Sequence, residues 1–133
     1  MSEAIYIVGG ARTPMGGLMG DLASVSAPEL GSTAIKAAVE RANLDAAAID
    51  EVFMGCVLPA GLKQCPARQA ARYAGVPDHV GAVTINKACG SGMQATIFGI
   101  DSIRAGTNSI AIAGGLESMS NAPHLMPSGR AGQ

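Results

Sequence analysis

Short apolar runs alternate along the chain with longer stretches that have helical spacing. The runs are five to eight residues long and almost continuously apolar, which is typical of strands that are covered on both faces. They fall at residues 4–8, 51–58, 82–86 and 109–113. This alternation predicts an α/β fold with a mostly parallel sheet that helices cover on both faces.

Two amphipathic helices are expected between these strands. The first begins at Ser26, which can cap the helix together with Glu29, and it ends near Asn43. The second covers residues 66–73, before a glycine and a proline stop it. Both have the polar stripe of an ordinary surface helix, so we assign them no chemistry.

The helix expected after Cys89 has almost no polar face. Its charged residues, Asp101 and Arg104, come late, and its apolar residues point in every direction. These apolar residues are Met93, Ala95, Ile97, Phe98, Ile100 and Ile103. A helix with this pattern is expected to be buried on all sides.

Cys89 lies where the third strand gives way to this helix. A helix N-terminus offers unpaired backbone N–H groups and the positive end of the helix dipole, and both favour thiolate over thiol. Gly90 and Gly92 lack Cβ atoms, so a substrate carbonyl can approach the turn, with the Cys89 N–H as an oxyanion donor. The pattern indicates a nucleophilic cysteine. The alternative is a structural cysteine in a glycine-rich turn.

Composition narrows the class of protein. The 133 residues suit one domain, and three cysteines in a chain without a basic leader favour a reducing compartment, so we expect a cytoplasmic protein. The formal net charge is -1 and lysines and arginines form no cluster, which argues against a nucleic-acid partner. No apolar run approaches the ~18 residues of a membrane span, so we expect no membrane partner.

Four motifs follow one another along the sequence. They are GGARTPMGG near the start, PARQAARYAGVP in the middle, NKACGSGMQA around Cys89, and AGGLESMSNAPH near the end. In this order, from about Ile5 to Pro127, they resemble the thiolase family. The resemblance implies a thiolase-like fold.

The resemblance also implies an activity. It is that of an acyltransferase, an acetyl-CoA acetyltransferase that condenses two acetyl-CoA molecules to acetoacetyl-CoA or catalyses the reverse thiolysis. Cys89 matches the nucleophile that carries the acyl group as a thioester. Acyl-CoA and coenzyme A would be substrates, and no metal or other cofactor is expected. Family members are homodimers or homotetramers, paired partly through the strand that corresponds to residues 82–88.

Thiolases are considerably longer than this chain. The resemblance implies that residues 1–133 are an incomplete N-terminal thiolase domain, without its last strand, the loop insertion and the C-terminal thiolase domain. The histidine and the second cysteine of the family's mechanism come from that C-terminal half, so this chain alone is expected to be inactive. We interpret Cys56 as strand core, Cys65 as a residue near a helix cap, and His79 and His124 as turn and loop residues.

Two other functions stay open. One is a ketoacyl-synthase-like condensing enzyme, which shares the fold and the nucleophile, and the other is a non-catalytic acyl-binding or assembly module. Glu117 and Asn121 follow the last strand, where α/β sheets place their sites, and they either line a site or serve the loop. The glycines of residues 9–17 lack the spacing of a dinucleotide-binding loop.

Overall fold

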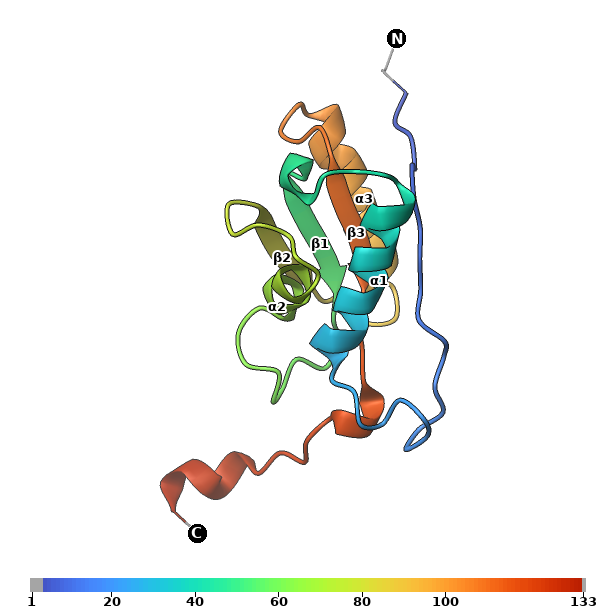
Figure 1. Ribbon diagram of the computed structural model, residues 1–133. Coiled ribbons are helices and arrows are strands. Elements are labelled where there is room, and N and C mark those ends of the chain that lie inside the picture. The colour runs from blue at the N-terminus through green and yellow to red at the C-terminus, as the bar shows by residue number, and fades with distance from the viewer. Residues whose placement is uncertain (1–3, 133) are drawn as a thin grey trace.

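The computed structural model describes residues 4–132 and places helices on the two faces of a small sheet (Figure 1). The main elements are α1 (Ala27–Arg41), β1 (Glu51–Gly55), α2 (Pro66–Tyr73), β2 (Gly81–Ile85), α3 (Ser91–Arg104) and β3 (Ala111–Gly115). Short 3-10 helices lie at Ala46–Ala48, Met119–Asn121 and Pro127–Ala131.

The three strands found among the described residues form a parallel sheet in the order β2-β1-β3. In the central strand, Val52 is aligned with Ala82 of β2 on one side and with Ile112 of β3 on the other. Helices α1 and α2 pack together on one face of the sheet, and α3 covers the opposite face. The predicted α/β architecture is therefore confirmed.

Side chains of β1 alternate between the two faces, as they must in a strand. Val52 and Met54 join Ile35 of α1 in the larger core cluster. Phe53 points the other way and packs in a second cluster with Ala95 of α3. The central strand thus contributes to the core on both sides of the sheet.

The first two helices form much as the sequence predicted. Ser26 is the N-cap of α1, and its N–H and Oγ both donate to Glu29 Oε2, at 2.9 and 2.6 Å. These hydrogen bonds, the one from the hydroxyl first, lower the pKa of Glu29. Helix α1 ends at Arg41, close to the expected end, and α2 has the expected bounds.

Strand β1 is shorter than predicted. It ends at Gly55 and not at residue 58. Beyond it, the N–H groups of Val57 and Leu58 donate to the Glu117 carboxylate, at 2.9 and 3.0 Å. Because a side chain takes these donors, they cannot extend the sheet ladder.

Strand β3 begins later than predicted for a similar reason. It starts at Ala111 and not at residue 109. Asp50 directly precedes β1 in the sequence. Its Oδ2 accepts the N–H groups of Ser109 at 2.7 Å and Ile110 at 2.9 Å. These two bonds lower the pKa of Asp50, the one from Ile110 contributing most.

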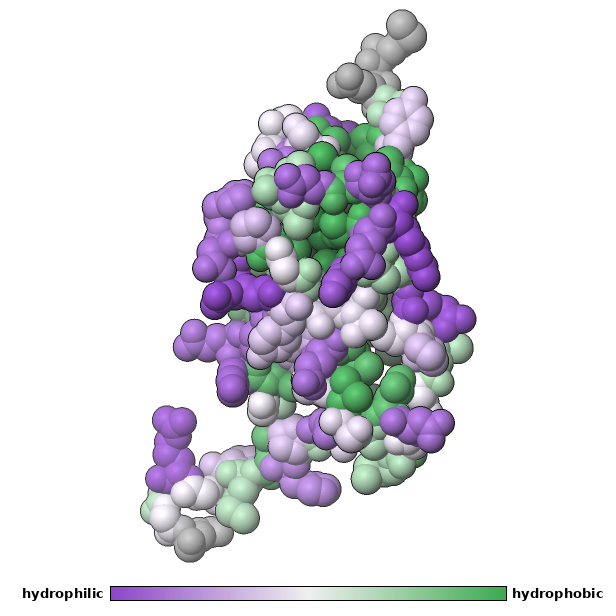
Figure 2. Space-filling model, in the orientation of Figure 1, coloured by the Kyte–Doolittle hydropathy of each residue, from purple (hydrophilic) through white to green (hydrophobic). Residues whose placement is uncertain are grey.

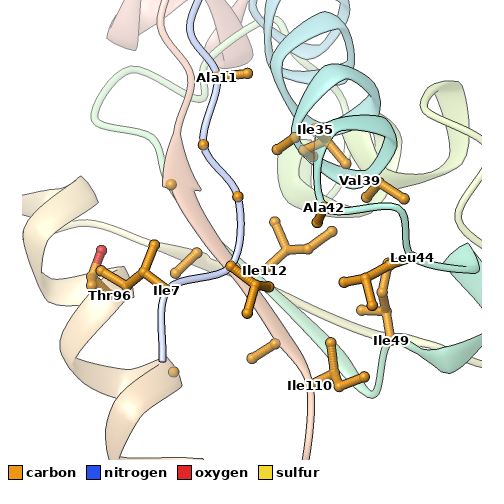
Figure 3. A pocket seen from close by; sticks show the side chains of 18 of the residues that line it. Ile7, Ala11, Ile35, Val39, Ala42, Leu44, Ile49, Thr96, Ile110 and Ile112 are labelled. Atoms are coloured by element: carbon orange, nitrogen blue, oxygen red, sulfur yellow. The ribbon is translucent and has the colours of Figure 1, made fainter. Parts of the chain in front are cut away.

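The predicted strand at residues 4–8 is wrong, because this segment has no strand structure. Tyr6 and Ile7 are 78% and 88% exposed. A groove of about 400 Å³ is lined by this segment together with α1, α3 and β3 (Figure 3). A ladder needs a neighbouring backbone about 4.8 Å away, and among the described residues this segment pairs with no strand, although it lines the groove together with β3. Apolar surface stays visible near the end of α1 (Figure 2).

Helix α3 is buried on one face only. Ser91, Ala95 and Gly99 are buried, whereas Met93 is 73% and Phe98 43% exposed. This corrects the expectation of burial on all sides, because the sheet covers one side of the helix and the other side faces solvent. Neither α3 nor any other helix within residues 4–132 has the length and apolarity needed to cross a membrane.

Candidate active site

Cys89 lies in a tight turn between the carboxyl end of β2 and the start of α3, and it is exposed. The N-cap of α3 is Gly90 and the first helical residue is Ser91. The cysteine therefore stands one residue before the cap, slightly earlier than the sequence indicated. It remains beside the end of the helix where backbone N–H groups point outward.

The residue before the cysteine has an unusual backbone conformation. Ala88 has a φ of 47°, in the left-handed region that non-glycine residues rarely adopt. Its N–H donates to Asn86 Oδ1 at 3.1 Å, and its carbonyl oxygen accepts from Ser91 Oγ at 2.6 Å. Both backbone groups of Ala88 are thus held by side chains on either side of the turn.

Further bonds close the turn. Ser91 Oγ accepts the Lys87 N–H at 2.8 Å, and the Gly90 N–H donates to the Lys87 carbonyl at 3.0 Å. The Lys87 ammonium donates to Gln94 Oε1 at 2.6 Å, which fixes this cation beside the first turn of α3. Among residues 4–132, no hydrogen bond engages the exposed Cys89 thiol, and the Cys89 backbone forms an isolated β-bridge with that of Lys87. The thiol is free to meet a ligand.

Glycines bring the start of α3 close to the sheet. A Cβ on Gly55 of β1 would lie 2.6 Å from the Ser91 carbonyl carbon, a contact that real Cβ atoms do not make. The Cβ position of Gly92 faces Gly114 of β3, at 3.7 Å from its carbonyl oxygen. A methyl group at Gly92 would thus make only an ordinary van der Waals contact with β3, and Gly90 has only the Lys87 carbonyl oxygen within 4 Å of its Cβ position.

Glu117 follows β3 and turns inward to the loop after β1. Besides the two backbone N–H groups described above, its Oε1 lies 3.6 Å from Cys56 Sγ. Burial raises the pKa of the Cys56 thiol to about 11, and the negative charge of Glu117 and its bond with the thiol add to the rise. Of the two interpretations offered by the sequence, the loop role accounts for Glu117.

The other two cysteines, the two histidines and Asn121 all lie outside the turn that carries Cys89. Cys56 is buried, and Cys65 is the half-buried N-cap of α2, with its Sγ 3.5 Å from Thr84 Oγ1. His79 lies in a turn, with its Nε2 3.4 Å from the Ala47 carbonyl oxygen, and His124 lies in an exposed loop. Asn121 Nδ2 donates to two carbonyl oxygens in the loop before α1, those of Ala23 and Val25.

Within the described part of the chain, no group of three or more histidines, cysteines and carboxylates is placed to hold a metal ion. The large groove beside β3 does not include Cys89 or its turn among its lining residues. The exposed Cys89 thiol beside the N-terminal end of α3 is thus the chemically distinctive feature.

Asn86 and Ser91 are the site residues that the sequence reasoning missed. A serine one residue after a glycine cap and an asparagine directly after a strand both have known turn-forming chemistry. That chemistry is the signal by which they could have been found.

Comparison with known proteins agrees with this geometry. The family model described as thiolase, N-terminal domain, matches residues 5–133. The cytosolic acetyl-CoA acetyltransferase of Gibberella zeae is 53% identical over 128 residues, and acetyl-CoA acetyltransferase 2 of Arabidopsis thaliana is 52% identical over the same number. Each alignment covers 96% of this chain and 32% of the relative.

A solved structure gives the same result. The crystal structure of the Acat5 thiolase from Ascaris suum in complex with coenzyme A matches with a TM-score of 0.89 and 42% identity. The match covers 93% of this chain and 32% of that one. The chain thus spans about a third of the length of the relatives that it matches. The resemblance noted in the sequence is confirmed, and the chain belongs to the thiolase family, to the part described as its N-terminal domain.

Proposed function

We propose that this chain supplies the acyl-accepting cysteine of a thiolase-type acetyl-CoA acetyltransferase. The observation that carries the proposal is the exposed Cys89 thiol, held before the N-cap of α3 in a chain about half identical to acetyl-CoA acetyltransferases. Coenzyme A thioesters are the proposed substrates, and the Ascaris suum relative was solved with coenzyme A.

The proposed reaction has two halves. The Cys89 thiolate attacks the carbonyl carbon of acetyl-CoA, and the Cys89 N–H donates to the oxyanion that forms. Collapse of this intermediate breaks the bond to the coenzyme A sulfur, which leaves as a thiolate and takes up a proton. The acetyl group is then a thioester on Cys89.

In the second half, another acetyl-CoA loses an α-proton and its carbanion attacks the Cys89 thioester. The product is acetoacetyl-CoA, and the Cys89 thiolate is released; thiolysis runs these steps backward. This chemistry uses no metal and no redox cofactor. The base for the thiol and the base for the α-proton are expected in the part of a thiolase that follows the matched third.

The proposed domain organisation follows from this division. Residues 1–133 would be an N-terminal thiolase domain that lacks its last strand, the loop insertion and the C-terminal domain. We further propose a cytosolic homodimer or homotetramer. The name of the Gibberella zeae relative supports the location, and the outer edge of β2, unpaired within the described residues, supports association. Light scattering on the purified protein tests the oligomer.

The activity is tested with a hybrid enzyme. In it, this chain replaces the matching 128 residues of the Gibberella zeae acetyltransferase. We expect the hybrid to cleave acetoacetyl-CoA with coenzyme A, and the 133-residue chain alone to show no thiolysis above background. The second expectation rests on general acid-base help, which typically contributes about 100-fold to 10,000-fold. An inactive but folded hybrid would favour a non-catalytic acyl-binding module.

A further inference from the structure

The side chain of Asn86 connects two separate parts of the molecule. It is the first residue after β2, and both the oxygen and the nitrogen of its side-chain amide form hydrogen bonds. Its Oδ1 accepts the Ala88 N–H at 3.1 Å, and its Nδ2 donates to the Val57 carbonyl at 3.3 Å. One asparagine thus ties the turn before Cys89 to the loop that follows β1.

The loop on the far side of this tie is itself fixed. The Val57 N–H donates to Glu117 Oε2 at 2.9 Å, and Glu117 follows β3. The carboxyl ends of β2, β1 and β3 are therefore joined in series by Asn86, Val57 and Glu117. A displacement of the turn has to break at least one of these bonds.

The conformation that the tie holds is one that the backbone does not favour by itself. An alanine in the left-handed region has its Cβ close to the carbonyl oxygen, so Ala88 returns to an ordinary conformation unless other groups restrain it. Asn86 restrains its N–H, and the buried Ser91 hydroxyl restrains its carbonyl. The dihedral angles of Ala88 set the direction in which Cys89 leaves the turn.

We propose that Asn86 is a positioning residue that holds Ala88 in the left-handed conformation and so aims the Cys89 thiol and N–H at the same carbonyl group, the thiol at its carbon and the N–H at its oxygen. The proposal rests on the proposed function, since it concerns acyl transfer to Cys89. Asn86 itself touches no reacting atom. Its effect is on the rate of the chemical step and not on the binding of the substrate.

The test measures acyl-enzyme formation from acetyl-CoA in the hybrid enzyme, by rapid quench and intact mass. Asn86→Ala should lower the maximal rate about 10-fold to 100-fold, the size of effect that a misplaced reacting group produces, while the half-saturating acetyl-CoA concentration changes little. Asn86→Asp keeps an oxygen for the Ala88 N–H but loses the bond to Val57. Its maximal rate should therefore lie between those of the parent hybrid and Asn86→Ala. Asn43→Gly is the matched control, because Asn43 is exposed, follows α1 and has a φ of 52° that glycine accepts readily.

A second variant separates positioning from loss of fold. Ala88→Gly removes the steric cost of a positive φ. In the Asn86→Ala background it should restore several-fold of the lost rate, which repair of general stability would not do. An unchanged rate in Asn86→Ala, or no rescue by Ala88→Gly, would overturn the positioning proposal. The proposed function would still stand in that case, provided that the parent hybrid forms an acyl adduct.

A readout that needs no acyl transfer covers the remaining case. If the parent hybrid forms no acyl adduct, the proposed function fails, and iodoacetamide is then applied to the 133-residue chain at neutral pH. Asn86→Ala should slow alkylation of Cys89 several-fold and leave that of Cys65 unchanged. Equal alkylation of Cys89 in the two proteins would contradict the positioning role.

Discussion

Glu117 Oε2 accepts a hydrogen bond from the Val57 N–H at 2.9 Å, across 60 residues of sequence. Oε1 of the same carboxylate accepts the Leu58 N–H at 3.0 Å. This carboxylate ends the ladder of β1 and joins the carboxyl ends of two parallel strands. The same edge of the sheet carries the turn with Cys89, so a structural bond and the candidate chemistry share one end of the fold.

Glu117→Gln should lower the free energy of unfolding by about 1–3 kcal/mol, since one of two backbone donors then faces an NH2 group and loses its acceptor. Urea denaturation followed by circular dichroism measures it. Glu40→Gln on the exposed side of α1 is the control and should stay within about 0.5 kcal/mol of the parent protein. Equal effects of the two changes would remove the special role of Glu117.

Gly55→Ala should destabilise the fold by about 1–3 kcal/mol, because the new methyl group meets the backbone of Ser91 and has to push α3 from the sheet. Thermal unfolding detects the change. Gly17→Ala adds the same methyl group where no atom lies within 4 Å and should have a small effect. A Gly55→Ala protein as stable as the parent would mean that α3 does not pack as described.

Thiol labelling should distinguish the three cysteines at pH 8. Cys89 is exposed and should react first with iodoacetamide, and half-buried Cys65 more slowly. Cys56 should react last, since a pKa raised to about 11 leaves almost no thiolate at that pH and burial blocks the reagent. In urea, all three should react at similar rates. Rapid labelling of Cys56 in the native protein would contradict its environment.

Acid should weaken the junction of β1 and β3 through Asp50. The bonds from Ile110 and Ser109 lower its folded-state pKa below the ordinary 3.8, so they stabilise the fold fully above that value. This contribution is lost as the pH falls through the lowered pKa. Asp50→Asn should therefore flatten the acid side of a stability curve between about pH 5 and pH 2. Parallel acid curves for parent and Asp50→Asn would contradict the assignment.

Local signals predicted the parts of the fold that depend on local chemistry. The bounds of α2 and the Ser26–Glu29 cap follow from residues within a few positions of each other. The strand at residues 4–8 was wrong because an apolar run forms a strand only where a neighbouring backbone is within reach. The exposure of Met93 was missed because an apolar pattern does not say what covers it.

The candidate site was predicted in the same partial way. Cys89 was identified from its place between strand and helix, together with the resemblance of the surrounding motif. The bond from Asn86 to Val57 spans 29 residues and that from Cys56 to Glu117 spans 61, so neither follows from local spacing. Such bonds depend on which strands lie side by side, and here β1 pairs with both β2 and β3.

The central claim is that Cys89 carries the acyl group, and the most direct measurement is the mass of the hybrid enzyme after brief incubation with acetyl-CoA. We expect one acetyl group per chain, located by peptide mapping on the peptide that contains Cys89. The adduct should be absent in Cys89→Ala, a small-for-small change at an exposed position that should leave the fold intact. An acetyl adduct that persists in folded Cys89→Ala, or that maps to Cys65 or Cys56, would contradict the account.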